Sequence, residues 1–126
     1  MPVPVLLVED DLQIRWMMRR MLGRGGYAVQ EVGESEACLA ALRGGFSGVV
    51  LLDIGLPDRT GWETLRLANE EGLLARCLVC VFTGAGAPGT DQEALTALVF
   101  DYIPKPFTPE QLLELVGNAA GNLPSS

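Results

Sequence analysis

Acidic side chains follow two apolar segments of this sequence at the point where each segment ends. Glu9 and Asp10 come directly after residues 5–8, and Asp53 comes directly after residues 48–52. If both segments are neighbouring parallel strands, their carboxyl ends meet at one edge of the sheet. Three carboxylates at that edge repel each other unless a cation lies among them. Oxygen ligands without histidine or cysteine suit a hard divalent ion, so the pattern predicts a Mg²⁺ site.

Two further polar residues end apolar segments and extend the same chemistry. Thr83 follows residues 78–82, and Lys105 follows residues 99–104. A threonine hydroxyl can hydrogen-bond a phosphoryl oxygen and a lysine can pair with one, while Asp53, alone among apolar neighbours, is a candidate nucleophile toward phosphorus. Each residue singly also fits a structural role such as a helix cap. The four strand ends together favour phosphoryl chemistry.

Lys105 is also unusual among the basic residues of the chain. Lysine and arginine together number nine, and Lys105 is the only lysine among them. A compact ammonium charge serves sites that a planar guanidinium fork does not fit, which favours a functional role for Lys105. An incidental surface lysine is the alternative.

Length and composition exclude several classes of function. The chain has 126 residues, 48% of them hydrophobic, which is enough for the core of one domain. We expect a single domain over residues 1–121 and a frayed tail or the beginning of a linker over 122–126. No apolar run is long enough for a membrane span, and no leader segment is evident. A net charge of −7 disfavours direct contact with nucleic acid, and three cysteines favour a cytoplasmic protein.

Apolar segments alternate with amphipathic ones along the whole chain. The predicted strands are 5–8, 27–32, 48–53, 78–82 and 99–104, and the predicted helices are 11–24, 35–43, 60–71, 90–98 and 108–120. This alternation predicts an α/β fold with a doubly wound five-stranded parallel sheet. The order 2-1-3-4-5, that of a flavodoxin-like (βα)5 fold with helices on both faces, would place the first and third strands side by side.

Residues with capping side chains precede the predicted helices. Asp11 and Ser35 are candidate caps of the first two helices. The later helices have three candidate capping pairs, namely Thr60 with Glu63, Thr90 with Glu93, and Thr108 with Gln111. In the last of these, Pro109 stands at the first position of the helix.

Taken in order, these motifs resemble those of a response-regulator receiver domain, of the CheY-like superfamily in two-component signal transduction. The resemblance covers residues 4 to about 120. Glu9 and Asp10 match the acidic pair of that family, and residues 53–57 with Gly61 match its phosphoacceptor motif. Residues 81–84 and 105–107 match the remaining two motifs, at the family's spacing.

The resemblance implies a Mg²⁺-dependent phosphoacceptor. Asp53 would accept a phosphoryl group from the phosphohistidine of a sensor histidine kinase or a histidine phosphotransfer protein. Because the chain has no histidine, that phosphohistidine belongs to a partner. Mg²⁺ would be held by Asp10, Asp53 and the backbone carbonyl of Gly55, with Glu9 acting through a metal-bound water. Lys105 would pair with the phosphoryl group.

The resemblance also implies a switch rather than an enzyme. The chain would assist its own phosphorylation and slow autodephosphorylation, with no other substrate. Thr83 and Tyr102 would move on phosphorylation and change the surface of the fourth helix, fifth strand and fifth helix, which would contact an unknown downstream protein or form a weak dimer. The family's cis peptide bond is expected at Lys105–Pro106.

The sequence departs from the family around the fourth helix. Leu98 and Val99 replace the usual Gly-Ala pair, and the glycine-rich residues 84–89 delay the helix. We predict a long mobile loop followed by a short fourth helix. Residues 84–89 also fit GxGxxG, but a dinucleotide site would require this pattern after the first strand of a longer fold.

Other hypotheses stay open beside the phosphoacceptor switch. A degenerate receiver would bind a partner without phosphorylation, and an aspartyl phosphatase would need a second acid where Gly55 stands. Cys77 and Cys80 form CxxC, although their spacing on a strand predicts opposite faces and a packing role. Trp16, flanked by arginines, fits either a docking site for the phosphodonor or a solvated helix face.

Overall fold

A computed structural model describes residues 2–83 and 93–124. Its strands are β1 (Pro4–Val8), β2 (Ala28–Val32), β3 (Gly48–Asp53), β4 (Cys77–Thr83) and β5 (Val99–Pro104), and its helices are α1 (Leu12–Arg24), α2 (Ser35–Arg43), α3 (Gly61–Glu70), α4 (Glu93–Thr96) and α5 (Pro109–Ala120). All strand pairs are parallel, in the order β2-β1-β3-β4-β5. The predicted α/β fold and strand order are confirmed.

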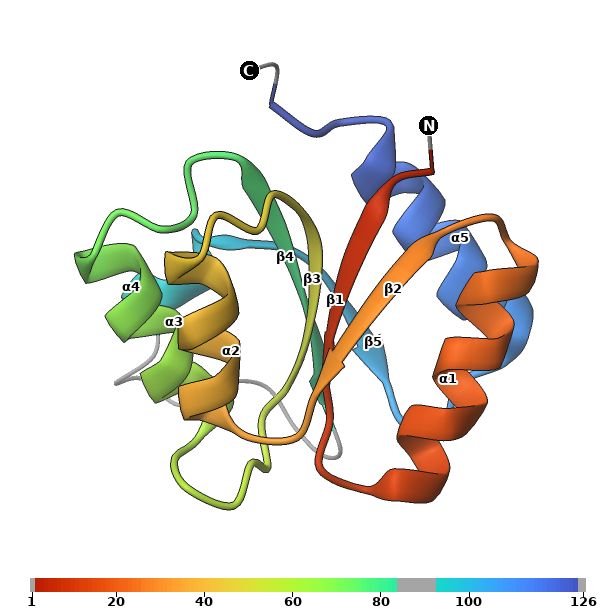
Figure 1. Cartoon of the computed structure of the whole chain (residues 1–126), viewed down its shortest axis with the longest axis horizontal. Coiled ribbons are helices and arrows are strands. Elements are labelled where there is room, and N and C mark those ends of the chain that lie inside the picture. The colour runs from red at the N-terminus through yellow and green to blue at the C-terminus, as the bar shows by residue number, and fades with distance from the viewer. Residues whose placement is uncertain (1, 84–92, 125–126) are drawn as a thin grey trace.

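The sheet separates two layers of helices (Figure 1). Helices α1 and α5 cover one face, and α2, α3 and α4 cover the other. Because side chains alternate along a strand, Leu6 and Val8 enter one core cluster while Val5 and Leu7 enter the other. Burial of both faces explains why the central strands are apolar almost throughout.

The CxxC pair follows the same alternation. Cys77 lies in the core cluster beneath α2 and α3, and Cys80 lies in the cluster beneath α1 and α5. Both thiols are buried and free. The predicted placement on opposite faces is therefore confirmed, and it keeps the two side chains on different sides of the sheet.

The register of β1 and β3 determines where the predicted site forms. Val8 pairs with Leu52, so Glu9 and Asp53 come one step later on adjacent strands. Both strands end at the lower edge of the sheet in Figure 1, and the chain termini lie at the opposite end. There, residues 2–4 and 123–124 line one shallow hollow.

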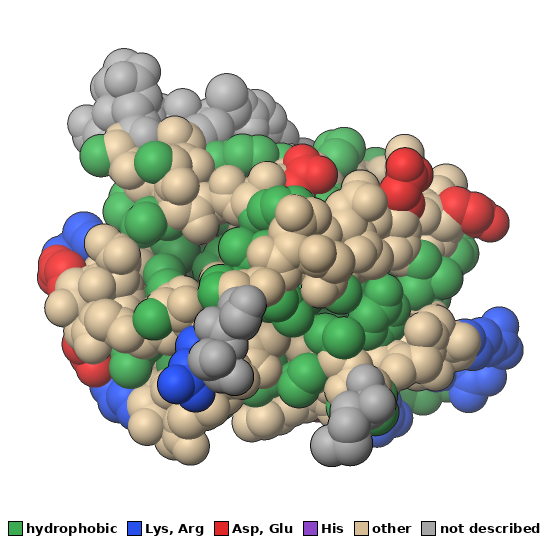
Figure 2. All heavy atoms as spheres, turned by 90° about the horizontal axis from the view of Figure 1, so that it is seen from above, with side chains coloured by type: hydrophobic (Ala, Val, Ile, Leu, Met, Phe, Trp, Pro, Cys, Tyr) green, Lys and Arg blue, Asp and Glu red, His purple; other side chains and the backbone are tan. Residues whose placement is uncertain are grey.

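Charged side chains are segregated between the two helices of one layer. Helix α1 carries four arginines and no acid, whereas α5 carries two glutamates and no base. Seen from the end with the termini, acidic side chains lie along the upper right of the molecule and basic ones along the lower right (Figure 2). A net negative protein thus presents one basic helix.

Two of the predicted helix caps form as expected. The side chain of Asp11 accepts hydrogen bonds from the backbone N–H groups of Gln13 and Ile14. Thr108 and Gln111 form a complete capping box around Pro109. These bonds satisfy backbone donors that the first helical turn leaves unpaired.

The caps of α2 and α3 differ from the prediction. Thr60 caps α3 by accepting from the N–H of Glu63, but the Glu63 side chain pairs with Arg66 instead of completing a box. Ser35 is wrong as the cap of α2, because Glu34 occupies the N-cap position and makes no side-chain cap bond. The first turn of α2 instead donates to Asp58, from another part of the chain.

The region around α4 is only partly described. Helix α4 is short, as predicted, but it ends at Thr96 instead of near residue 98. The predicted mobile loop, the GxGxxG residues 84–89 and the cap Thr90 lie outside the described residues. In the described ranges, none of the helices is long and apolar enough to cross a membrane.

Candidate functional site

Three carboxylates gather where β1 and β3 end. Each of Glu9, Asp10 and Asp53 offers an oxygen within 4.8 Å of the others. Glu9 is buried, Asp53 is partly exposed and Asp10 is open to solvent. A cluster with one buried and two accessible carboxylates can bind a hard cation that keeps several of its waters, as Mg²⁺ does. The donor chemistry therefore fits the predicted metal.

The buried carboxylate of Glu9 is held on both of its oxygens. Its Oε2 accepts from the backbone N–H of Asp11 at 3.1 Å, and its Oε1 accepts from Lys105 Nζ at 2.6 Å. Burial raises the pKa of Glu9 above its ordinary value, although the Lys105 hydrogen bond opposes that rise. Glu9 is thus fixed in place by Asp11, the N-cap residue of α1, and by Lys105, which follows β5.

Lys105 supplies the cation of this cluster. Its Nζ lies 3.4 Å from Asp53 Oδ2 in addition to its closer contact with Glu9. Burial alone would lower the pKa of Lys105, but the two carboxylates outweigh it and the pKa lies above its ordinary value. The peptide bond between Lys105 and Pro106 is cis, as predicted.

Asp53 is followed by a sharp change of chain direction. The N–H of Gly61 donates to the carbonyl of Ile54 at 2.8 Å, and the N–H of Gly55 lies 3.4 Å from Asp53 Oδ1. A Cβ on Gly61 would lie 2.5 Å from the carbonyl oxygen of Asp53, so only glycine fits there. The segment carrying Gly55 is therefore bound closely to the end of β3.

The two predicted switch residues have different outcomes. Thr83 ends β4 beside the site, but its side chain lies outside the described part of the structure. Tyr102 turns toward the α3 face of the sheet, where its ring centroid lies 6.3 Å from that of Trp62. Its hydroxyl is buried and, among the described residues, has no hydrogen-bond partner.

Two neighbours of the site were not identified from the sequence. Lys105 Nζ lies over the ring of Phe82, 5.8 Å from its centroid, and the ring favours the ammonium charge there. Arg15 donates to the backbone carbonyl of Glu9 at 3.4 Å and pairs with Glu31 of β2. The contact between Phe82 and Lys105 could have been found from the sequence, because an aromatic residue directly precedes Thr83. No local pattern predicts the contacts of Arg15.

An apolar surface lies on α1, beside this edge of the sheet. Leu12, Trp16 and Met17 are exposed, and Trp16 has 55% of its surface accessible. The guanidinium carbon of Arg20 lies 4.8 Å from the centroid of the Trp16 ring. Trp16 therefore does not enter the core.

Known proteins are similar to this chain along nearly its whole length. The family model of the response regulator receiver domain matches residues 5–117. Response regulator protein FleR of Pseudomonas aeruginosa is 34% identical over 100% of this chain and 26% of its own length. Response regulator MprA of Mycolicibacterium vanbaalenii is 32% identical over 90% of this chain and 48% of its own length. The chain thus spans half or less of each of these two relatives.

Solved structures show the same likeness. A receiver domain protein described as CheY-like, from Methanospirillum hungatei, superposes with a TM-score of 0.88 at 34% identity, covering 94% of each chain. The five-stranded parallel sheet in the order β2-β1-β3-β4-β5 agrees with this likeness. The chain belongs to the response regulator receiver domain family, whose typical role is that of a phosphoacceptor in two-component signalling.

Proposed function

We propose that this chain is a phosphoacceptor switch in which Asp53 takes a phosphoryl group from a partner's phosphohistidine. The observation that supports this proposal most strongly is that Asp53, two further carboxylates and Lys105 lie together at the carboxyl ends of the strands. A carboxylate oxygen of Asp53 would form the new P–O bond as the partner's P–N bond breaks, leaving the electron pair on the imidazole nitrogen.

The residues around Asp53 would bind the metal ion and the transferred phosphoryl group. Asp10, Asp53 and the Gly55 carbonyl would hold Mg²⁺, with Glu9 acting through a water. When bound, Mg²⁺ supplies positive charge to the transferring oxygens. Lys105, whose Nζ already lies 3.4 Å from Asp53, would pair with the phosphoryl group after transfer.

The added phosphoryl charge would then alter the surface around β5. A phosphoryl group carries about −1.5 to −2 charges near neutral pH, if serine-type phosphates are a guide. Thr83 would move toward it, and Tyr102, whose hydroxyl lacks a partner in the described structure, would repack with it. The surface of α4, β5 and α5 would thereby contact a downstream protein or form a weak dimer.

We infer that the chain is a cytoplasmic switch and not a turnover enzyme. Incubation with acetyl phosphate and Mg²⁺, followed by intact mass measurement, tests this. One phosphoryl adduct that is lost in Asp53→Asn supports the switch. No adduct would favour a degenerate receiver that only binds partners, and rapid turnover of varied phosphate esters would favour a phosphatase.

A further inference from the structure

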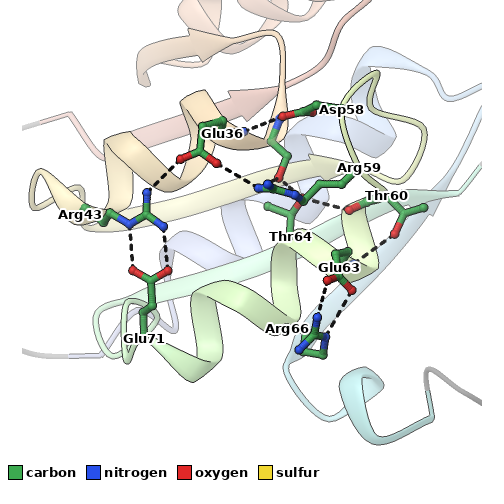
Figure 3. A network of polar contacts seen from close by, with 10 residues as sticks. Glu36, Arg43, Asp58, Arg59, Thr60, Glu63, Thr64, Arg66 and Glu71 are labelled. Atoms are coloured by element: carbon green, nitrogen blue, oxygen red, sulfur yellow. Dashed lines mark hydrogen bonds and ion pairs between the residues drawn. The ribbon is translucent and has the colours of Figure 1, made fainter.

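The segment between β3 and α3 contains a carboxylate that reaches across to another helix. Asp58 Oδ1 accepts from the backbone N–H of Ser35 at 2.8 Å, and Oδ2 accepts from the N–H of Glu36 at 3.0 Å. Figure 3 shows Asp58 beside the beginning of α2. Because each of its oxygens is bound by a different backbone donor, the side chain is fixed in both position and orientation.

These two bonds replace a cap that α2 does not supply itself. Glu34 occupies the N-cap position in an extended conformation and makes no side-chain cap bond. Desolvation would raise the pKa of Asp58, but the N–H groups of Ser35 and Glu36 hold it below its ordinary value. Asp58 is therefore a charged cap provided from outside the helix.

A second set of bonds joins the same segment to α2 and α3. Arg59 Nη1 donates to Glu36 Oε2 at 3.1 Å and to Ser35 Oγ at 3.3 Å. The hydroxyls of Ser35 and Thr64, both buried, lie 2.5 Å apart, and Thr64 donates to the carbonyl of Thr60 at 2.9 Å. The contacts close a ring through the segment, α2 and α3 (Figure 3).

This ring holds the middle of the segment whose first residues lie at the acidic cluster. Its beginning and end are joined by the bond from Gly61 to Ile54. Between them, the side chains of Asp58 and Arg59 hydrogen-bond the segment to the first turn of α2. A Cβ added at Gly55 would meet nothing within 4 Å, so this part of the segment lies in open space on that side.

We propose that Asp58 is a positioning residue for the Mg²⁺ site, acting by holding the β3–α3 segment and its Gly55 carbonyl against α2. This inference rests on the proposed function, because it concerns the same metal site. Residues that orient a metal ligand commonly change metal affinity by about 10–100-fold when removed. Asp58→Ala should accordingly weaken Mg²⁺ binding about tenfold, near the lower end of that range.

A cap that only stabilises α2 would also lower the stability of Asp58→Ala, so the two roles must be separated. Glu34→Ser places a favourable cap residue at the extended N-cap position of α2. In the double variant Asp58→Ala/Glu34→Ser, α2 regains a cap, but the segment still lacks the two hydrogen bonds through Asp58. If Asp58 positions the segment, the double variant should regain its stability toward urea without regaining its Mg²⁺ affinity.

Mg²⁺ titrations followed by ¹H–¹⁵N NMR supply affinities without any phosphorylation assay. Asp58→Asn, which keeps one acceptor oxygen, should bind with intermediate affinity. Glu34→Gln, which removes an exposed charge at the same end of α2, should bind as the wild type does and so controls for charge. The Gly55 amide should also shift in metal-free Asp58→Ala.

Two results would overturn the inference. Wild-type affinity in Asp58→Ala would exclude positioning, and full recovery of affinity in the double variant would assign Asp58 to helix stability alone. If the wild type itself bound no Mg²⁺, this titration would contradict the proposed Mg²⁺-dependent function, and the positioning role of Asp58 would fall with it. The wild-type titration therefore distinguishes the two failures.

Discussion

Lys105 binds Glu9 more closely than it binds Asp53, at 2.6 Å against 3.4 Å. The last strand is thus linked to the end of the first strand through a buried carboxylate. In the absence of a phosphoryl group, Lys105 neutralises part of the acidic cluster and leaves its accessible side, at Asp10, open. In the switch that we propose, the ammonium group of Lys105 would move from Glu9 toward the phosphoryl group on Asp53.

Lys105→Arg tests whether this relationship needs an ammonium group. A planar guanidinium carries the same charge but cannot take the same position between two carboxylates. We expect Asp53 to be phosphorylated still, while the change in the Tyr102 amide signal on phosphorylation is much reduced in NMR spectra. Arg76→Lys, an equally conservative exchange before β4, is the control. A wild-type response in Lys105→Arg would show that any cation suffices there.

Gly61→Ala tests the close approach of α3 to the end of β3. The new Cβ would lie 2.5 Å from the Asp53 carbonyl oxygen and 2.9 Å from the Ile54 Cα, and backbone cannot yield as a flexible side chain does. We expect a loss of about 1–3 kcal/mol in the free energy of unfolding, measured with urea. Gly55→Ala is the matched control, because its Cβ meets nothing within 4 Å. Equal stability of both variants would contradict this packing.

The strands and the residues that end them could be predicted because each depends on a local pattern. The apolar runs end at Glu9 and Asp53, and the order 2-1-3-4-5 of a doubly wound sheet then places both acids at one edge. The cap of α2 could not be predicted, because Asp58 lies 23 positions from Ser35 and competes with the nearer candidates. Likewise, the position of Thr60 indicated a cap, but Arg66 attracts the Glu63 side chain more strongly than the N-cap backbone does.

Trp16→Ala tests whether the exposed face of α1 contacts the phosphodonor. If it does, transfer from a phosphorylated histidine phosphotransfer protein should slow markedly, whereas phosphorylation by acetyl phosphate, which needs no docking, should not change. Phe100→Ala removes another exposed aromatic side chain, from β5, and should leave both rates unchanged. Equal transfer rates in the Trp16 variant and the wild type would leave α1 as a solvated face.

The three cysteines should be unreactive in the folded protein. Burial raises the pKa of the Cys38 and Cys80 thiols to about 12 and raises that of Cys77 as well. Because thiolates are the reactive form, labelling by Ellman's reagent should be slow at about pH 8, become faster as the pH rises, and be rapid for all three in urea. An internal disulfide between Cys77 and Cys80 in the folded protein would contradict the packing role.

Chemical trapping identifies the residue that accepts the phosphoryl group, which we propose to be Asp53. Treatment with acetyl phosphate and Mg²⁺, followed by borohydride reduction, converts an aspartyl phosphate into homoserine, which peptide mass spectrometry then locates. We expect homoserine at residue 53, dependent on Mg²⁺ and absent when acetyl phosphate is omitted. Homoserine at Asp10 or Asp58, or unmodified Asp53 under conditions that saturate the protein with Mg²⁺, would contradict it.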